Sequence, residues 1–131
     1  LFQLIFTFAY CQLLVAYCTN SPFSYIKDMI SIDVIDREGQ SHQIEAPVDM
    51  GLNLMEVCKI AELPVEGTCG GMALCASCHV YVLSDHQLKE RSEAEEDMLD
   101  KAFFVDESSR LACQVRITED LNGLKIKLAP V

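Results

Sequence analysis

The sequence predicts an α+β fold, in which a mixed β-sheet has a helix packed across it and an irregular loop beside it. Apolar and polar residues alternate over residues 30–34 and again over residues 124–128, which is the period of a half-buried strand. Between them, residues 53–61 carry apolar side chains at helical spacing. A hairpin, a helix, an irregular loop and returning strands together favour this class.

The elements follow in order along the chain. The turn-forming residues 37–40 separate the first strand from a return strand around His42 and Ile44. The helix over residues 53–61 ends before Pro64. A short apolar strand is then expected over residues 79–83.

A second helix is predicted further along. Ser92 with Glu95 three residues later is a capping-box pattern, and we expect the helix to run to about Phe103. Asn122 and Gly123 predict a turn before the final strand.

Length and charge limit the possible functions. The chain has 131 residues, half of them apolar, which suits one compact domain. Its formal charge is −10 at pH 7. We therefore expect it to repel nucleic acid and anionic membrane surfaces and to bind basic protein partners.

The first 28 residues differ from the rest. Residues 1–17 are almost entirely apolar, and no charge appears before Lys27. The segment lacks the basic start of a signal peptide and the arginines of a transit peptide. We expect residues 1–28 to be non-native or a gene-model extension and residues 29–131 to form the functional domain. A membrane anchor is the alternative, because the apolar run is at the lower edge of a membrane span.

Four of the seven cysteines form the main motif, C-x5-C-x2-C-x34-C. Three of them lie in one glycine-rich segment and the fourth is far along the chain, which suits a 2Fe–2S cluster because each of its two irons takes two thiolates. Gly67, Gly70 and Gly71 can adopt the backbone angles that direct N–H groups toward cluster sulfurs. The predicted ligands are Cys69, Cys75, Cys78 and Cys113.

The remaining cysteines do not indicate disulfides. The chain has seven cysteines in all, an odd number, and their spacing is not that of a small secreted protein held together by disulfides. We therefore expect a reducing compartment, either the bacterial cytoplasm or, in a eukaryote, the mitochondrial matrix. Cys58 lies in the first predicted helix, where we expect a small buried hydrophobic residue. Cys11 and Cys18 have no motif around them.

Two other metal sites fit part of the motif. Cys75–His79 also reads as the C-x-x-C-H signal for c-type haem, but this leaves Cys69 and Cys113 unused. A structural zinc site would use all four thiolates, although such sites usually pair two short C-x-x-C knuckles and only one is present.

The chain resembles the adrenodoxin-type ferredoxins over about residues 29–131. The resemblance depends on the cysteine spacing, on Cys78-His79-Val80-Tyr81-Val82, on Asp97-Met98-Leu99-Asp100 and on Arg110-Leu111-Ala112-Cys113-Gln114. It implies a β-grasp fold and an electron-transfer protein that is not itself an enzyme. It also implies a flavoprotein reductase as electron donor, and a haem-thiolate monooxygenase or the iron–sulfur assembly machinery as acceptor.

The resemblance also assigns supporting residues. It implies that His79 ties the cluster loop to Ser109, near the fourth ligand, and Gly70 and Gly71 are expected beside the cluster. It places docking acids on the second helix, in a segment (residues 83–107) with nine acidic and three basic residues. The matching acids are Glu93, Glu95, Glu96, Asp97 and Asp100. The alternative is a solvated helix face whose first turn is acidic because of the helix dipole.

Two alternative functions stay open at this point. One is a zinc module that mediates protein contacts, and the other is an electron-relay subunit held permanently by an enzyme. The acidic surface favours transient contacts over the second.

Overall fold

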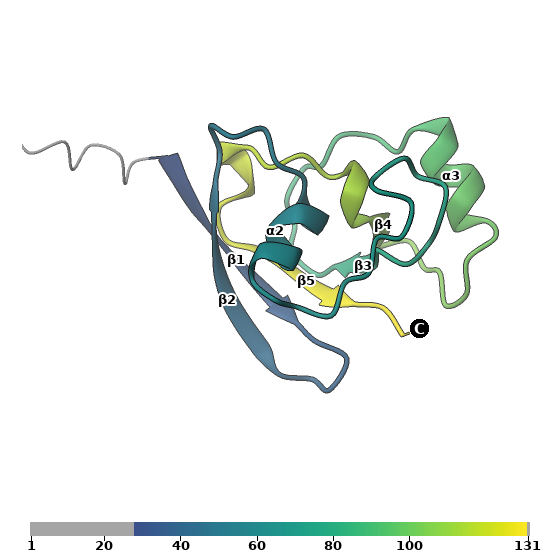
Figure 1. Ribbon diagram of the computed structural model, residues 1–131, viewed down its shortest axis with the longest axis horizontal. Helices are drawn as coiled ribbons and strands as arrows, with labels where there is room; N and C mark the ends of the chain where they lie inside the picture. The colour runs from purple at the N-terminus through teal and green to yellow at the C-terminus, as the bar shows by residue number, and fades with distance from the viewer. Residues whose placement is uncertain (1–27, 131) are drawn as a thin grey trace, which may run out of the picture.

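The computed structural model describes residues 28–130, which form one mixed five-stranded sheet with two α-helices beside it (Figure 1). The strand order is β2-β1-β5-β3-β4. The strands are β1 (Met29–Ile35), β2 (Ser41–Pro47), β3 (His79–Val82), β4 (Ser109–Leu111) and β5 (Leu124–Leu128). The helices are α2 (Leu54–Ile60) and α3 (Glu93–Leu99), with 3-10 turns η2 (Ala112–Gln114) and η3 (Glu119–Leu121).

The sheet combines parallel and antiparallel pairs. β1 and β2 form the predicted antiparallel hairpin, with Ile32 opposite Ile44. β5 lies parallel to β1, with Ile32 opposite Leu124, so the two ends of the domain meet in the middle of the sheet. β3 is antiparallel to both β5 and β4. The predicted α+β class with a mixed sheet is therefore confirmed.

Helix α2 agrees with the sequence prediction. Asn53 caps it by accepting a hydrogen bond from the Glu56 N–H, and the Glu56 carboxylate accepts one in return from the Asn53 N–H, each at 2.9 Å. Its apolar face is buried, including Cys58, which is fully buried as expected. The helix packs against η2, the segment that carries Cys113.

Helix α3 is shorter than predicted. Ser92 caps it by accepting from the Glu95 N–H, but the helix ends at Leu99 and does not reach Phe103. After Asp100 the backbone hydrogen bonds span three residues instead of four: the Lys101 N–H donates to the Met98 carbonyl, and the Ala102 N–H donates to the Leu99 carbonyl. Phe104 then has a φ of 59°, outside the helical region, so the helix cannot continue.

The core lies between the sheet and α2. Along β5, Leu124, Ile126 and Leu128 are buried while the two lysines between them are exposed, as the alternation predicted. β4 was not predicted, because it has only three residues and all are buried, which removes any alternation.

Within residues 28–130, no helix has the length and apolarity to cross a membrane. The predictions for the leader concern residues 1–28, of which residues 1–27 lie outside the described part.

Candidate metal centre

The loop between α2 and β3 adopts left-handed backbone angles at its glycines, as the sequence predicted. Gly67, Gly70 and Gly71 have φ values of 58°, 68° and 92°, and Ala73 has 53°. The Gly70 N–H donates to the Gly67 carbonyl at 3.1 Å, which closes a tight turn. Successive left-handed residues turn peptide N–H groups toward one concave side, an arrangement that binds anions.

The distant fourth cysteine reaches this loop through the sheet. Cys78 directly precedes β3, and Cys113 follows β4 in η2. Because β3 and β4 pair antiparallel with His79 opposite Leu111, the two cysteines lie at the same end of this strand pair. The Ala112 N–H donates to the Cys78 carbonyl at 2.9 Å, which holds the two segments together.

The four thiols lie in two close pairs. Cys69 lies near enough to Cys75 to help lower the pKa of the Cys75 thiol, and both residues lie within the loop and are partly exposed. Cys78 and Cys113 are both buried and lie near enough to shift each other's pKa in opposite directions. Charge interactions link Cys75 to Cys78 and to Cys113, so the two pairs are neighbours.

Two of the four thiols are acidic. Burial acts to raise the pKa of Cys75, but hydrogen bonds from Ser77 and Thr68 outweigh it and lower the pKa to about 6. The Oγ atom of Ser77 lies 3.0 Å from the Cys75 sulfur. The thiol of Cys78 lowers the pKa of Cys113 to about 6 despite burial. The same interaction, together with burial, raises the pKa of Cys78, because one proton is shared.

These donors fit a 2Fe–2S cluster. Thiolates are the ligands of such clusters, and each iron takes two, which matches two neighbouring thiol pairs. Within the described residues, no three His, Cys, Asp or Glu side chains form a group suited to a single metal ion. The low pKa values of Cys75 and Cys113 reduce the proton release that accompanies binding.

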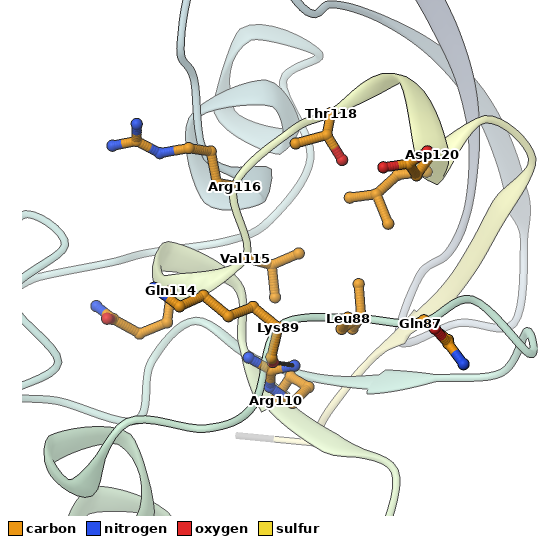
Figure 2. Close-up of a pocket in the computed structure, with 10 residues that line it drawn as sticks. Gln87, Leu88, Lys89, Arg110, Gln114, Val115, Arg116, Thr118 and Asp120 are labelled. Atoms are coloured by element: carbon orange, nitrogen blue, oxygen red, sulfur yellow. Dashed lines mark hydrogen bonds between the residues drawn. The ribbon is translucent and has the colours of Figure 1, made fainter.

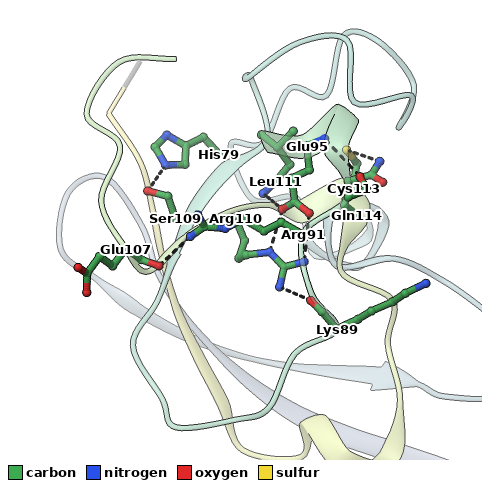
Figure 3. A network of polar contacts seen from close by, with 11 residues as sticks. His79, Lys89, Arg91, Glu95, Glu107, Ser109, Arg110, Leu111, Cys113 and Gln114 are labelled. Carbon is green, nitrogen blue, oxygen red and sulfur yellow. Dashed lines mark hydrogen bonds and ion pairs between the residues drawn. The ribbon is translucent and has the colours of Figure 1, made fainter. Parts of the chain in front are cut away.

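The predicted contact between His79 and Ser109 is present. The His79 Nε2 lies 2.8 Å from the Ser109 Oγ, and both side chains are buried (Figure 3). The Ser109 Oγ also accepts from the Asp106 N–H at 2.8 Å. Burial lowers the pKa of His79, although the nearby Asp106 carboxylate acts to raise it.

Gln114 is a supporting residue that the sequence analysis missed. Its Nε2 donates to the Gly71 carbonyl at 3.1 Å and to the Cys113 sulfur at 3.4 Å, so it joins the loop to the fourth cysteine. Figure 3 shows the Gln114 side chain beside Cys113. The only feature of the sequence that pointed to Gln114 was its position directly after Cys113. The spacing of residues does not predict the direction of an amide side chain. Thr68 and Ser77 were missed for the same reason.

Glu95 is not a docking acid, which corrects the sequence prediction. It is 1% exposed and accepts from Arg110 Nε at 2.8 Å, Arg110 Nη2 at 3.1 Å and the Leu111 N–H at 2.9 Å (Figure 3). The carboxylate therefore anchors α3 to β4, two residues before Cys113, and cannot meet a partner. It also does not close the expected capping box with Ser92. The other four predicted acids are exposed: Glu93, Glu96, Asp97 and Asp100.

Two hollows lie near this region. One, of about 300 Å³, is lined by Leu88 and Val115 among other residues, and the Arg116 side chain points away from these two (Figure 2). None of the four cysteines lines it. The second, of about 410 Å³, is an open hollow between the cysteine loop and the end of α3, and Cys75 is part of its wall.

Comparison with known proteins agrees with this geometry. The 2Fe–2S iron–sulfur cluster binding domain family matches residues 35–118. A 2Fe–2S ferredoxin of Rickettsia montanensis is 42% identical over 101 residues, covering 76% of this chain and 88% of that protein. Adrenodoxin-like protein 2, mitochondrial, of Arabidopsis thaliana is 34% identical over 104 residues, covering 77% of this chain and 52% of that protein.

The chain belongs to the adrenodoxin-type 2Fe–2S ferredoxins. Its fold is the β-grasp fold of that family, as expected. In the solved covalent complex of putidaredoxin reductase and putidaredoxin, the matching chain is 28% identical, with a TM-score of 0.67, over 75% of this chain and 96% of that one. The ferredoxin is an electron carrier with one 2Fe–2S cluster.

Proposed function

We propose that the cluster is held by Cys69, Cys75, Cys78 and Cys113, with one iron on each thiol pair. The observation that carries this proposal is the arrangement of the four thiols as two neighbouring pairs, Cys69 with Cys75 and Cys78 with Cys113. A single zinc ion would need all four around one point. When bound, the cluster takes up and releases one electron at a time.

The protein's own residues would set the conditions for that exchange. Gly70 and Gly71, both at positive φ, let backbone N–H groups approach the sulfurs. Ser77 and Gln114 lie within hydrogen-bonding distance of cysteine sulfurs, and such bonds stabilise the charge on the ligands. His79 and Ser109 hold together the segments that carry Cys78 and Cys113.

We further propose that a flavoprotein ferredoxin reductase supplies the electron. The similarity to the ferredoxin of the putidaredoxin reductase complex supports this partner. The exposed carboxylates Glu93, Glu96, Asp97 and Asp100 give α3 a negative face that would attract a basic surface. Because the same face would serve donor and acceptor, they would bind in turn and the ferredoxin would move between them.

The acceptor in this proposal is a haem-thiolate monooxygenase or the iron–sulfur assembly machinery. The compartment would be the bacterial cytoplasm or the mitochondrial matrix, in line with a Rickettsia relative and a relative named as mitochondrial. Residues 29–131 would form the ferredoxin domain, since the strands and the family match fall within this range.

The ligand assignment is tested by anaerobic reconstitution with iron and sulfide. We expect two irons and two sulfides per chain and a brown protein with visible absorption bands from thiolate–iron charge transfer. Serine at any of the four positions should abolish or alter these bands, whereas Cys58→Ala should keep them. A colourless chain that holds one zinc ion would instead support the structural zinc module.

A further inference from the structure

Three apolar side chains follow α3 and point into solvent. Phe103, Phe104 and Val105 are 83%, 65% and 41% exposed, and we call them the apolar rim. Single exposed apolar side chains are common on protein surfaces, but these three are consecutive and together form a contiguous apolar surface. Surfaces of this kind on otherwise polar proteins mark sites of interaction.

The backbone under the apolar rim is strained. Phe104 has a φ of 59°, a region that bulky residues avoid at a cost of about 1–2 kcal/mol. Its carbonyl accepts a hydrogen bond from the Tyr81 hydroxyl, which fixes the loop to β3. Asp106, further along, accepts bonds from the Ser108 N–H and hydroxyl. Such strain persists where the surroundings enforce it, and it is concentrated at functional sites.

The apolar rim lies beside the metal centre. Phe103 lines the open hollow of about 410 Å³ together with Met98, Pro130 and the proposed ligand Cys75. The exposed acids Asp97 and Asp100 lie immediately before it on α3 and its C-cap. The exposed Lys101 also lines the hollow, between the two carboxylates and Phe103 in sequence. An apolar surface therefore faces solvent beside a proposed ligand, with two carboxylates and one lysine around it.

We infer that the apolar rim is the apolar anchor of the interface with the flavoprotein reductase. An apolar side chain of the reductase enters the hollow against Phe103, the reductase surface beside it covers Phe104, and basic side chains around it meet Asp97 and Asp100. This inference rests on the proposed function and adds the residues that hold the complex together once charge has brought the partners near.

Charge selects this occupant over a second copy of the chain. Two copies meeting through this surface would bring their own Asp97 and Asp100 face to face, on chains with a net charge of −10. A partner with a basic border has no such repulsion. The apolar contact buries area without charge, so its contribution to binding does not depend on salt.

The test uses the reconstituted holoprotein, with putidaredoxin reductase as the probe. The variants are Phe103→Ala, Phe104→Gly and Asp97→Asn. Met50→Ala is the matched control, because Met50 is 66% exposed and lies in the loop between β2 and α2, away from α3 (Figure 1). The measurements are the Kd for the reductase at low and high salt, the reduction potential and the melting temperature.

We expect Phe103→Ala and Phe104→Gly each to weaken binding about tenfold, equally at both salt concentrations, as is usual for a central aromatic anchor. The reduction potential should stay unchanged. Phe104→Gly should also raise the melting temperature, because glycine adopts this φ without strain. A residue with a purely structural role would lower stability and binding together.

Other results overturn the inference in distinct ways. Wild-type affinity in both phenylalanine variants, with a salt-dependent loss in Asp97→Asn, would remove the apolar anchor and leave the proposed function standing. If the wild-type holoprotein were a dimer and either phenylalanine variant were a monomer, the surface would instead bind a second copy of the chain. A holoprotein that dithionite reduces and the reductase neither binds nor reduces would contradict the reductase partnership itself.

Discussion

The His79 imidazole and the Ser109 hydroxyl form a buried hydrogen bond of 2.8 Å across 30 residues of sequence. His79 follows Cys78 and begins β3, while Ser109 begins β4, which leads to Cys113. The bond therefore links the chain segments that carry the two buried cysteines. It gives a direct way to test how the scaffold supports the cluster.

Ser109→Ala should leave the His79 Nε2 buried without this partner, at a cost of about 1–3 kcal/mol. We expect faster loss of the visible absorption of the cluster and a shifted reduction potential, and His79→Gln should act in the same direction. The control is Ser108→Ala, because the Ser108 hydroxyl donates to the Asp106 carboxylate and not to His79. Unchanged cluster lifetime and potential in both variants would exclude a supporting role for the pair.

Glu95→Gln should destabilise the fold by about 3–5 kcal/mol, because it leaves the Arg110 guanidinium buried without a counter-charge. The matched control is Glu96→Gln at the next position, whose side chain is exposed and whose change should stay within about 0.5 kcal/mol. Urea unfolding measures both. Equal stability of the two variants would mean that the buried ion pair contributes nothing to the fold.

Asp97→Asn should slow electron transfer from a flavoprotein reductase several-fold at low salt and much less at high salt, since ions screen exposed charges. Glu38→Gln removes the same charge from the exposed turn between β1 and β2, so it separates local docking from net charge. Stopped-flow reduction at several salt concentrations is the measurement. Matching salt dependence in both variants would show that only net charge matters.

Gly67→Ala should disrupt the cysteine loop. A β-carbon at Gly67 would lie 2.1 Å from the Met55 sulfur, and the φ of 58° adds strain. Gly39→Ala is the control, since its φ is 88° but no atom lies within 4 Å of the added carbon. Both variants should lose about 1–2 kcal/mol from strain, and only Gly67→Ala should lose a further ~1–3 kcal/mol from overpacking and hold less cluster. Thermal unfolding and the iron content decide the comparison.

Cys58 provides a prediction about pH. Burial raises the pKa of its thiol from 9.0 to about 12 in the folded chain. Between pH 9 and 12 the unfolded state therefore binds fewer protons at this position than the folded state, so stability should fall as pH rises. Cys58→Ala should show a weaker alkaline loss in urea unfolding at pH 8 to 10. In the folded holoprotein at pH 8, iodoacetamide should leave Cys58 unmodified, and rapid alkylation there would contradict its burial.

Local patterns predicted the elements that local forces define. The hairpin, α2 and β5 were recovered because the alternation of apolar residues and the capping residues lie within a few positions of one another. β4 and the end of α3 were not recovered. β4 is defined by pairing with β3, and α3 ends at Leu99, after which the backbone bonds of Lys101 and Ala102 reach back three residues instead of four.

Glu95 illustrates the limit for the site. Its neighbours in sequence indicate a surface acid on a helix, and only the structure reveals that Arg110, 15 residues away, draws its carboxylate into the core. No periodicity marks such a partner, because the ion pair depends on how α3 packs against β4.

The order and spacing of cysteines and glycines predicted the class of cofactor, because cluster ligation requires these residue types at these intervals. Together with the motifs at residues 78–82, 97–100 and 110–114, they also indicated the family. The pairing of the thiols, the contacts of His79 and Gln114 and the exposure of the phenylalanines after α3 were decided only in three dimensions. The physical reason is that the register between β3 and β4, which brings Cys78 and Cys113 together, results from packing among residues far apart in the chain.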